Sequence, residues 1–390
     1  MFNKHAMKTL RIGLLGYGTI GQGVYKHLKQ NAALLEQRLG IRMEITRIGE
    51  PNMNRAFAVK PPLKIVTADS FSIVDDPKID IVCELIGGTN VARTLTQQAL
   101  KNGKCVVTAN KALLSLHGKE LFELANKYGA HYFFEASVAG GIPIIKVIRE
   151  GLIANRFNLI YGILNGTCNY ILTRMEREGA PFDEILKDAQ RLGYAEANAG
   201  LDVDGIDTAH KAVILGYLAN GHWMKLKDMI VDGIRDITPQ DIAYARELGY
   251  KIKLLALIGR DEKSKKFFVR VHPTLLPLQN IMASVDDVFN AVSVSGDVSG
   301  TTVHIGRGAG MDATASAVIS DLADAALTIL GGPDPVISEE NPHLYEQVAG
   351  NLKIASLEDI RGRYYLRLRV KDAPGVLEKV AHELAKNEVS

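Results

Sequence analysis

Two residues capable of acid–base chemistry, Asp207 and Lys211, stand four positions apart in this 390-residue chain. Residues four apart share one face of a helix, and the same stripe continues through the apolar Ile214 and Leu218. A lysine that heads an apolar stripe is expected in a cleft, where desolvation lowers its pKa and a neighbouring carboxylate raises it again. Such a lysine can hold or transfer a proton at a substrate oxygen. Exposed ion pairs have the same spacing, so spacing alone does not separate the two interpretations.

The loop before this pair contributes further carboxylates. A helical pattern over 182–192 ends at Gly193, a residue type suited to a helix C-terminus. Glu196, Asp202 and Asp204 follow it. We therefore expect the segment 193–211 to carry the chemistry of the chain.

A glycine motif, GYGTIG, comes directly after the apolar run 12–15 and directly before a helical pattern. In such a motif the first glycine, here Gly16, permits a tight turn, and the second, Gly18, lets the backbone approach a pyrophosphate. The third, Gly21, lets the helix pack closely on the strand, while the helix N-terminus supplies N–H groups. This context predicts a dinucleotide-binding turn.

The acidic residue expected about 20 positions after the motif is ambiguous. Glu50 is placed to bind a ribose hydroxyl, whereas Arg47 or Arg55 is placed to meet a 2′-phosphate. The arginines favour NADP, and NAD stays open as the alternative.

The elements that must position these residues fall into two patterns. From Leu10 to about residue 136, short apolar runs alternate with helical stretches, which is typical of βαβ units around a parallel sheet. From about 140 to 304, helical patterns at 182–192 and 206–220 stand among strand-like runs. We predict an α/β fold with a doubly wound, Rossmann-type dinucleotide-binding domain over 8–140 and an α+β second domain over 141–307.

The C-terminal part has a different character. Residues 331–362 are predicted to be a linker rich in Pro and Gly. In 363–390, RYYLRLRV alternates like a strand and VLEKVAHELAKN is an amphipathic helical pattern. One strand and one helix cannot bury a core of their own, so this part is a partial domain or an appendage.

Composition excludes several classes of function. The formal net charge of +2 gives no reason to expect a nucleic acid or an anionic membrane as a partner, and no apolar run is long enough to span a bilayer. The ten histidines show no metal-ligand spacing. Three scattered cysteines, Cys83, Cys105 and Cys168, fit a reducing cytoplasm. The expected partner is a small-molecule substrate.

The segment 193–211, GYAEANAGLDVDGIDTAHK, resembles the signature of the homoserine dehydrogenases, except that the family usually has Asp-Pro at Asn198-Ala199. Further similar stretches are NGTCNYILTRM (165–175), TANKALL (108–114) and FEASVAGGIPII (134–145). The resemblance covers roughly residues 8 to 330, and the residues from 363 onward look like the beginning of an ACT domain. That beginning is too short to imply feedback control by an effector.

This resemblance implies an NAD(P)-dependent enzyme that interconverts L-homoserine and L-aspartate 4-semialdehyde, a step towards threonine, isoleucine and methionine. Lys211 would be the acid–base group, with Lys111 as a second lysine near cofactor and substrate. Glu196 and Asp207 would bind the substrate amino group or orient Lys211, and Asp202 would support them. Thr167 and Tyr194 would complete the substrate contacts.

The resemblance also implies a cofactor, a metal and an assembly. The cofactor, NADP or NAD, would contact Gly16, Tyr17, Gly18, Thr19, Ile20, Gly21, Arg47, Thr89, Lys111, Gly193, Gly308 and Gly310. A structural sodium ion would be held by backbone carbonyl groups of Glu135, Val138, Gly140 and Ile142, because a hard cation takes oxygen ligands. Residues 308–330 would complete the dinucleotide-binding domain, and 141–307 would be a substrate-binding and dimerisation domain. Through this second domain the chain would form a homodimer or higher homo-oligomer.

Two other hypotheses stay open at this point. Cys168 is a candidate nucleophile for a semialdehyde dehydrogenase that forms a thioester, although no base stands beside it in the sequence and a buried thiol is favoured. A non-catalytic sensor of nucleotides or amino acids is the third possibility, suggested by the ACT-like end.

Overall fold

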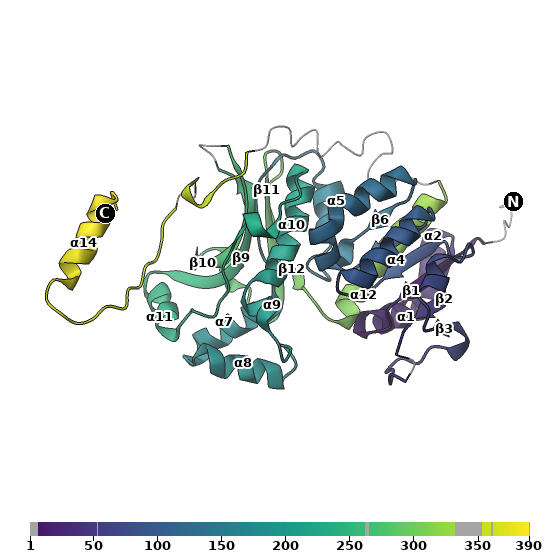
Figure 1. Cartoon of the computed structure of the whole chain (residues 1–390), viewed down its shortest axis with the longest axis horizontal. Coiled ribbons are helices and arrows are strands. Elements are labelled where there is room, and N and C mark those ends of the chain that lie inside the picture. The colour runs from purple at the N-terminus through teal and green to yellow at the C-terminus, as the bar shows by residue number, and fades with distance from the viewer. Residues whose placement is uncertain (1–6, 53, 262–264, 332–352, 360–361, 390) are drawn as a thin grey trace.

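The computed structural model describes residues 7–52, 54–261, 265–331, 353–359 and 362–389. Two six-stranded sheets lie side by side, each with helices packed on it (Figure 1). We call the first sheet with its helices the nucleotide half and the second sheet with its helices the substrate half. This arrangement confirms the predicted α/β fold with a parallel-sheet domain and a second sheet domain.

The first sheet is parallel throughout and has the order β3-β2-β1-β4-β5-β6. Its strands are β1 (Thr9–Leu15), β2 (Arg42–Gly49), β3 (Val66–Thr67), β4 (Ile81–Glu84), β5 (Cys105–Thr108) and β6 (Tyr132–Phe133). The strand order reverses between β1 and β4, and open α/β sheets bind their ligands at such a switch point.

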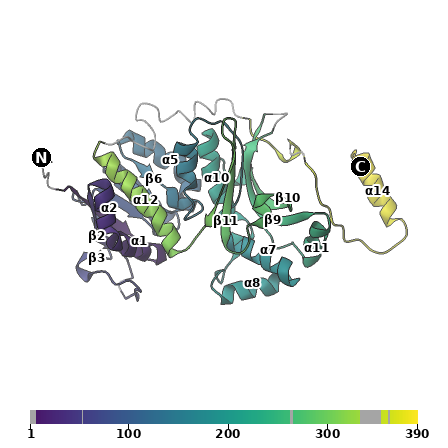
Figure 2. The same ribbon diagram turned by 180° about the vertical axis from the view of Figure 1, so that it is seen from behind.

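Helices cover both faces of this sheet, which explains why its strands are nearly continuous apolar runs. On one face lie α4 (Asn90–Lys101) and α5 (Lys111–Lys127), with the short α3 (Phe71–Val74). On the other face lie α1 (Thr19–Gln30) and α12 (Met311–Ile329), as Figure 2 shows. The helix α2 (Ala32–Leu39) follows α1, and 3-10 turns occur at η1 (Leu63–Ile65) and η2 (Glu135–Ser137).

The second sheet has the order β12-β11-β7-β9-β10-β8 and is antiparallel except where β8 joins β10. Its strands are β7 (Phe157–Ile163), β8 (Ile230–Val231), β9 (Tyr250–Arg260), β10 (Phe267–Pro277), β11 (Phe289–Gly296) and β12 (Gly300–Arg307). Associated with it are α6 (Ile144–Lys146), η3 (Val147–Gly151), α7 (Gly166–Glu178), α8 (Phe182–Arg191), α9 (Gly200–Val203), α10 (Ile206–Asn220), η4 (Leu226–Asp228), α11 (Pro239–Glu247) and η5 (Ile281–Ser284).

Helix α10 lies between the two halves, with α5 on one side and β9 and β10 on the other (Figure 1). Only Ile206, His210 and Ala219 among its residues are not fully buried. The chain crosses between the halves twice. The two crossings are neighbours, since the N–H of Gly141 in the first donates to the carbonyl oxygen of Arg307 in the second at 2.9 Å. The two halves therefore share a packed boundary around α10.

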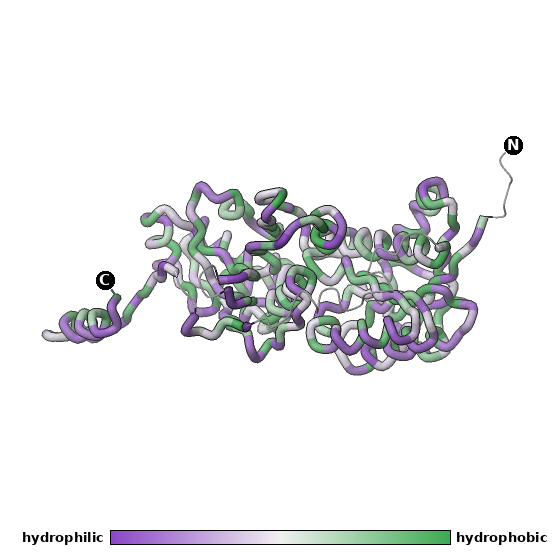
Figure 3. Tube along the Cα trace, turned by 90° about the horizontal axis from the view of Figure 1, so that it is seen from above, coloured by the Kyte–Doolittle hydropathy of each residue, from purple (hydrophilic) through white to green (hydrophobic). Residues whose placement is uncertain are grey.

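The C-terminal part differs from expectation in one respect. Within the described residues, 363–370 form no strand, because no neighbouring segment offers the backbone partners that a strand requires. Arg367 and Tyr365 instead bind the carboxylate of Asp241 at the start of α11. The helix α14 (Val376–Lys386) forms as predicted and lies apart from the body (Figure 3).

The expected linker 331–362 lies mostly outside the described residues. The piece 353–359 adds a bridge from Ile354 to Phe267 on β10 and the turn η6 (Leu357–Asp359). Across the described parts of the chain, no helix has the length and apolar character needed to cross a membrane.

Candidate active site

The GYGTIG turn lies at the switch point, between the end of β1 and the start of α1. Gly16 has φ +91°, and a Cβ there would lie 2.7 Å from the carbonyl oxygen of Leu85. A Cβ on Gly21 would lie 2.3 Å from the carbonyl oxygen of Gly16. At Gly18 no atom comes nearer to such a Cβ than Nη1 of Arg55, at 4.0 Å. The space over Gly18 is therefore open, as a pyrophosphate cradle requires.

Other expected cofactor residues surround this turn. Thr19 and Ile20 begin α1, and Thr89 is the N-cap of α4, directly after two exposed glycines at the end of β4. The side chain of Tyr17, in contrast, serves the core: it is fully buried, and its hydroxyl donates to the carbonyl oxygen of Val59 at 3.1 Å. Only the backbone of Tyr17 is available to a ligand.

Arg47 and Arg55, the two candidates to bind a 2′-phosphate, lie in different places. Arg47 lies within β2, half-buried, with Nη2 3.4 Å from the hydroxyl of Ser72. Arg55 approaches the position over Gly18, and its Nη1 lies 3.8 Å from the carboxylate of the buried Glu50. Arg55 rather than Arg47 therefore lies next to the glycine turn.

The predicted pair on α10 is buried. The Lys211 ammonium donates to Oδ2 of Asp207 and to the carbonyl oxygen of Leu164, both at 2.6 Å. The side chains of Lys211 and Asp207 are only 9% and 8% exposed, which excludes the exposed ion pair as an interpretation. Lys111, the first residue of α5, reaches across from the nucleotide half, with its ammonium 2.8 Å from Oδ1 of Asp207. One carboxylate thus joins two lysines from the two halves.

Burial and charge set the protonation of this cluster. Burial would raise the pKa of Asp207, but the ammonium groups of Lys211 and Lys111 outweigh it and hold that pKa well below its usual value. Burial lowers the pKa of Lys211, and Asp207 only partly opposes this. For Lys111 the attraction of Asp207 outweighs desolvation and raises the pKa. Lys211 is therefore the lysine that releases a proton more readily.

Asn165, a residue with no role predicted from the sequence, completes the cluster. It is the N-cap of α7, where its side-chain oxygen accepts from the N–H of Cys168 at 2.8 Å. Its amide nitrogen lies 2.7 Å from Oδ1 of Asp202 and 2.9 Å from Oδ2 of Asp207. Asn165 thereby fixes both carboxylates. The available signal was an Asn directly between a strand and a helical pattern, which is typical of an N-cap.

The other expected substrate residues are Thr167, at the start of α7, and Tyr194 and Glu196, in the loop before α10. Thr167 donates through its hydroxyl to the carbonyl oxygen of Tyr194 at 2.8 Å. The Tyr194 side chain is exposed, and Gly193 follows Leu192, the C-cap of α8, with φ +78°. Glu196 is exposed, and its backbone oxygen accepts from Gln190 at 3.1 Å. Its carboxylate acts on Lys111 only through its charge.

The turn expected to hold sodium lies at the first crossing between the halves. Ala139 and Gly140 have φ of 55° and 50°, which makes the backbone fold back tightly here. The carbonyl oxygen of Ile142 accepts from the N–H of Ile144 at 2.7 Å, and that of Glu135 accepts a long bond from Val138 at 3.5 Å. Of the residues that the structure describes, no three His, Cys, Asp or Glu side chains form a metal-binding group.

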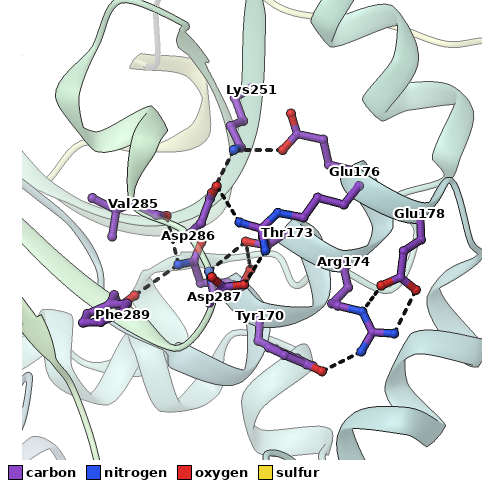
Figure 4. A network of polar contacts seen from close by, with 12 residues as sticks. Tyr170, Thr173, Arg174, Glu176, Glu178, Lys251, Val285, Asp286, Asp287 and Phe289 are labelled. Carbon is purple, nitrogen blue, oxygen red and sulfur yellow. Dashed lines mark hydrogen bonds and ion pairs between the residues drawn. The ribbon is translucent and has the colours of Figure 1, made fainter.

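A second polar network holds the body of α7 in place (Figure 4). The Lys251 ammonium lies 2.9 Å from Glu176 and 2.8 Å from Asp286, and the N–H of Asp287 donates to the hydroxyl of Thr173 at 3.1 Å. Because these contacts tie α7 to β9 and to the turn before β11, they help to fix the position of Asn165 at the start of the helix.

Comparison with known proteins assigns this chain to a family. Residues 16–135 match the family model "Homoserine dehydrogenase, NAD binding domain", and residues 143–323 match "Homoserine dehydrogenase". The homoserine dehydrogenase of Pseudomonas aeruginosa is 43% identical over 388 residues, covering 98% of this chain and 87% of that protein. The chain belongs to the homoserine dehydrogenase family.

Solved structures agree with this assignment. A homoserine dehydrogenase from Thiobacillus denitrificans is 46% identical, with a TM-score of 0.90, and the match covers 97% of this chain and 87% of that one. A hyperthermophilic archaeal homoserine dehydrogenase, solved in complex with NADPH, shares the fold with a TM-score of 0.69 at 24% identity. As a homoserine dehydrogenase, the chain is an oxidoreductase with a nicotinamide dinucleotide-binding domain.

Membership of this family leaves no role for a thiol nucleophile, and the surroundings of Cys168 agree. The residue is fully buried, and its sulfur donates to the carbonyl oxygen of Asp202 at 3.2 Å. Burial raises the pKa of the thiol well above its usual value. A neutral, enclosed thiol is a poor nucleophile. All three cysteines of the chain, each within the described residues, are buried and outside disulfides.

Proposed function

We propose that Lys211 is the acid–base residue for the interconversion of L-homoserine and L-aspartate 4-semialdehyde. The observation that carries this proposal is the burial of its ammonium group between Asp207 and the carbonyl oxygen of Leu164. An ammonium group has three N–H donors, and these two acceptors occupy two of them. One N–H is left for a substrate oxygen.

When bound, the nicotinamide cofactor supplies or accepts the hydride at the carbonyl carbon. The protein must then align the substrate and move one proton at its oxygen. In the direction of reduction, Lys211 donates a proton to the oxygen as the alcohol forms. In the direction of oxidation, the neutral amine takes that proton back. The lowered pKa of Lys211 suits both directions.

We propose that the acidic groups around this lysine recognise the substrate ammonium. Asp202 lies next to Asp207 through Asn165, and Glu196 stands on the exposed side of the same loop. Thr167 and Tyr194 lie on the same side, at the start of α7 and the end of α8. Lys111, which stays protonated, balances the charge of Asp207 and would lie between the cofactor and the substrate.

Replacement of Lys211 by Met tests the central assignment. It removes the transferable proton, so NADPH oxidation with aspartate 4-semialdehyde should be lost while NADPH binding, followed by fluorescence, persists. Lys119→Met is a matched control, because Lys119 also has an acidic partner four residues away, Glu123, but both side chains are about 60% exposed. Normal turnover by Lys211→Met would exclude this residue as the acid–base group.

We propose that NADP is preferred over NAD. Arg55 supports this, because its Nη1 lies 3.8 Å from the carboxylate of Glu50, the residue placed to bind the ribose, and its guanidinium can meet a 2′-phosphate there. Glu50, buried and holding the N–H of Asn52 at 3.0 Å, remains able to bind a ribose hydroxyl, so some use of NAD is expected. Arg55→Ala should lower the ratio of kcat/KM with NADPH to that with NADH, and an unchanged ratio would contradict the preference.

We propose that the carbonyl groups of Glu135, Val138, Gly140 and Ile142 bind a structural sodium ion. Two left-handed residues in succession turn this backbone tightly, and carbonyl oxygens suit a hard cation. A carbonyl oxygen that already accepts one hydrogen bond keeps a second lone pair. Exchange of sodium for a bulky organic cation at equal ionic strength should lower the unfolding temperature, and an unchanged temperature would argue against the site.

We further propose a homodimer formed through the substrate half, in the cytoplasm, serving threonine, isoleucine and methionine synthesis. Supporting the assembly, Leu159, Leu257 and Phe268 line part of a hollow of about 750 Å³ in the second sheet, which charged residues such as Arg260 and Lys265 also line. Leu257→Lys should convert a dimer into a monomer in sedimentation experiments. A monomeric wild-type chain would contradict this proposal without affecting the catalytic one.

A further inference from the structure

A buried carboxamide without a partner lies near the second crossing between the halves. Asn290, the second residue of β11, is 1% exposed. Within the described part of the chain, neither its Oδ1 nor its Nδ2 forms a hydrogen bond. Buried amides almost always have partners, since an unpaired one destabilises the fold. One explanation for such a group is a hydrogen-bond partner that is in place only when the ligands are bound.

The surroundings of Asn290 connect it to both ligand regions. A Cβ on Gly308 would lie 2.0 Å from Cγ of Asn290, so the carboxamide fills the space beside this glycine. A Cβ on Gly166, the first residue of α7, would lie 3.6 Å from Oδ1 of Asn290. The carboxamide therefore lies between the backbone of the crossing 308–310 and the first turn of α7.

Gly308 is enclosed on its other side as well. A Cβ on Gly140 would lie 2.5 Å from the carbonyl oxygen of Gly308. The crossing backbone thus passes between Gly140 of the first crossing and the carboxamide of Asn290. Any shift of residues 308–310 relative to α7 must move them along this carboxamide.

Asn290 itself is held firmly by the segment before it. Asn169 on α7 donates through its amide nitrogen to the carbonyl oxygens of Val285 and Phe289, at 3.0 and 3.1 Å. The fully buried Lys253 donates to the carbonyl oxygen of Val285 at 2.6 Å. Figure 4 shows Val285, Asp286, Asp287 and Phe289 gathered against α7 in this way. The position of Asn290 is therefore fixed relative to α7.

We propose that Asn290 is a positioning residue for hydride transfer, whose carboxamide seats the backbone of residues 308–310 against α7 when the nicotinamide cofactor binds. A peptide group offers one N–H and one C=O, which match the acceptor and donors of a primary amide. This inference rests on the proposed function, because it requires the cofactor to contact Gly308 and Gly310. Asn290 acts through that backbone and touches neither reactant.

The test replaces Asn290 by Leu, which has nearly the same size and no polar atoms. Because the amide has no partner in the ligand-free chain, the unfolding temperature without ligand should not fall. The dissociation constant for NADPH should rise about fivefold, the equivalent of one neutral hydrogen bond. The kcat should fall about tenfold or more, since a slightly misplaced nicotinamide slows hydride transfer strongly.

Ser293→Ala is the matched control. Ser293 lies on the same strand, is fully buried, and its hydroxyl also lacks a partner among the described residues. It pairs with Tyr161 and Val303, away from the crossing. Its replacement should leave both the NADPH affinity and kcat unchanged.

Several outcomes would overturn the inference. Wild-type NADPH affinity and kcat in Asn290→Leu would contradict it. A lower unfolding temperature of this variant without ligand would also contradict it, because Asn290 would then be a structural residue. Asn290→Ser, which removes the amide without adding bulk, should show the same loss of NADPH affinity, and normal binding by both variants excludes the role. If the wild-type chain itself fails to oxidise NADPH with aspartate 4-semialdehyde, the proposed function fails instead.

Discussion

Removal of the buried Asp207 carboxylate should strongly lower the free energy of unfolding of this protein. In Asp207→Asn, the Lys211 ammonium remains enclosed without its counter-charge. Breaking a buried ion pair by removing one partner costs about 3–5 kcal/mol. We expect about 3 kcal/mol of unfolding free energy, the lower end of that range, because the Asn oxygen still accepts a hydrogen bond. The contact of Asp207 with Lys111 adds little, since the Lys111 side chain is 42% exposed and can turn to water.

Urea unfolding with a matched control measures this loss. Asp204 lies just before α10 and pairs with Arg235, but the two side chains are 46% and 48% exposed. Asp204→Asn should therefore cost less than about 1 kcal/mol. Similar losses in the two variants would show that the Asp207–Lys211 pair is not buried in solution, and the argument for a cleft lysine would fail.

The pH dependence of the loss provides a second check. Without Asp207 the folded-state pKa of Lys211 falls further below the unfolded value of about 10.4. Between those two pKa values the unfolded chain binds more protons, so the stability of the variant rises with pH. The pKa of Lys211 is lowered in wild type as well, so the difference from wild type should shrink as the pH rises from the folded-state pKa of the variant to that of wild type. A difference that is independent of pH would mean that Lys211 is not the group left uncompensated.

Three further variants test separate parts of the site. Gly16→Ala forces a Cβ to within 2.7 Å of the Leu85 carbonyl oxygen at φ +91°, so NADPH affinity in a fluorescence titration should fall by about tenfold or more. Cys168→Ser should leave turnover nearly unchanged, because the enclosed thiol is not ionised, whereas complete loss would revive the thioester mechanism. Lys111→Met removes a positive charge that lowers the pKa of Lys211. The basic limb of the pH profile for aldehyde reduction should therefore move to higher pH, and a downward shift would contradict the assignment.

The sequence predicted the elements of the fold well because their patterns are local. The helical pattern 206–220 matches α10 residue for residue, and 182–192 ends within one residue of α8. The strand expected in 363–370 is wrong for a non-local reason: alternation makes a segment suitable for pairing, but only another segment can pair with it. Within the described residues, Tyr365 and Arg367 bind Asp241 at a helix start instead.

The site was only partly accessible to sequence reasoning. The spacing of Asp207 and Lys211 predicted a shared face, and the apolar stripe predicted burial, but neither could place Lys111 opposite them. Lys111 is 96 residues away in the chain from Asp207 (207 − 111), and their ion pair depends on how α5 packs against α10. Asn165 was missed for a similar reason, since its N-cap role is local while its contacts with Asp202 and Asp207 are not.

The acidity of Lys211 therefore depends on the boundary between the halves and not on α10 alone. Lys211, Asp207 and Asn165 all come from the substrate half, whereas Lys111 begins a helix of the nucleotide half, directly after a strand end at the cofactor edge of the sheet. The charge of Lys111 lowers the pKa of Lys211 while its partner Asp207 raises it. Replacement of Lys111 by an uncharged residue would remove this influence on Lys211. The pKa of Lys211 would then rise, and the lysine would hold its proton. The packing of α5 against α10 therefore makes Lys211 a better proton donor than it would be without Lys111.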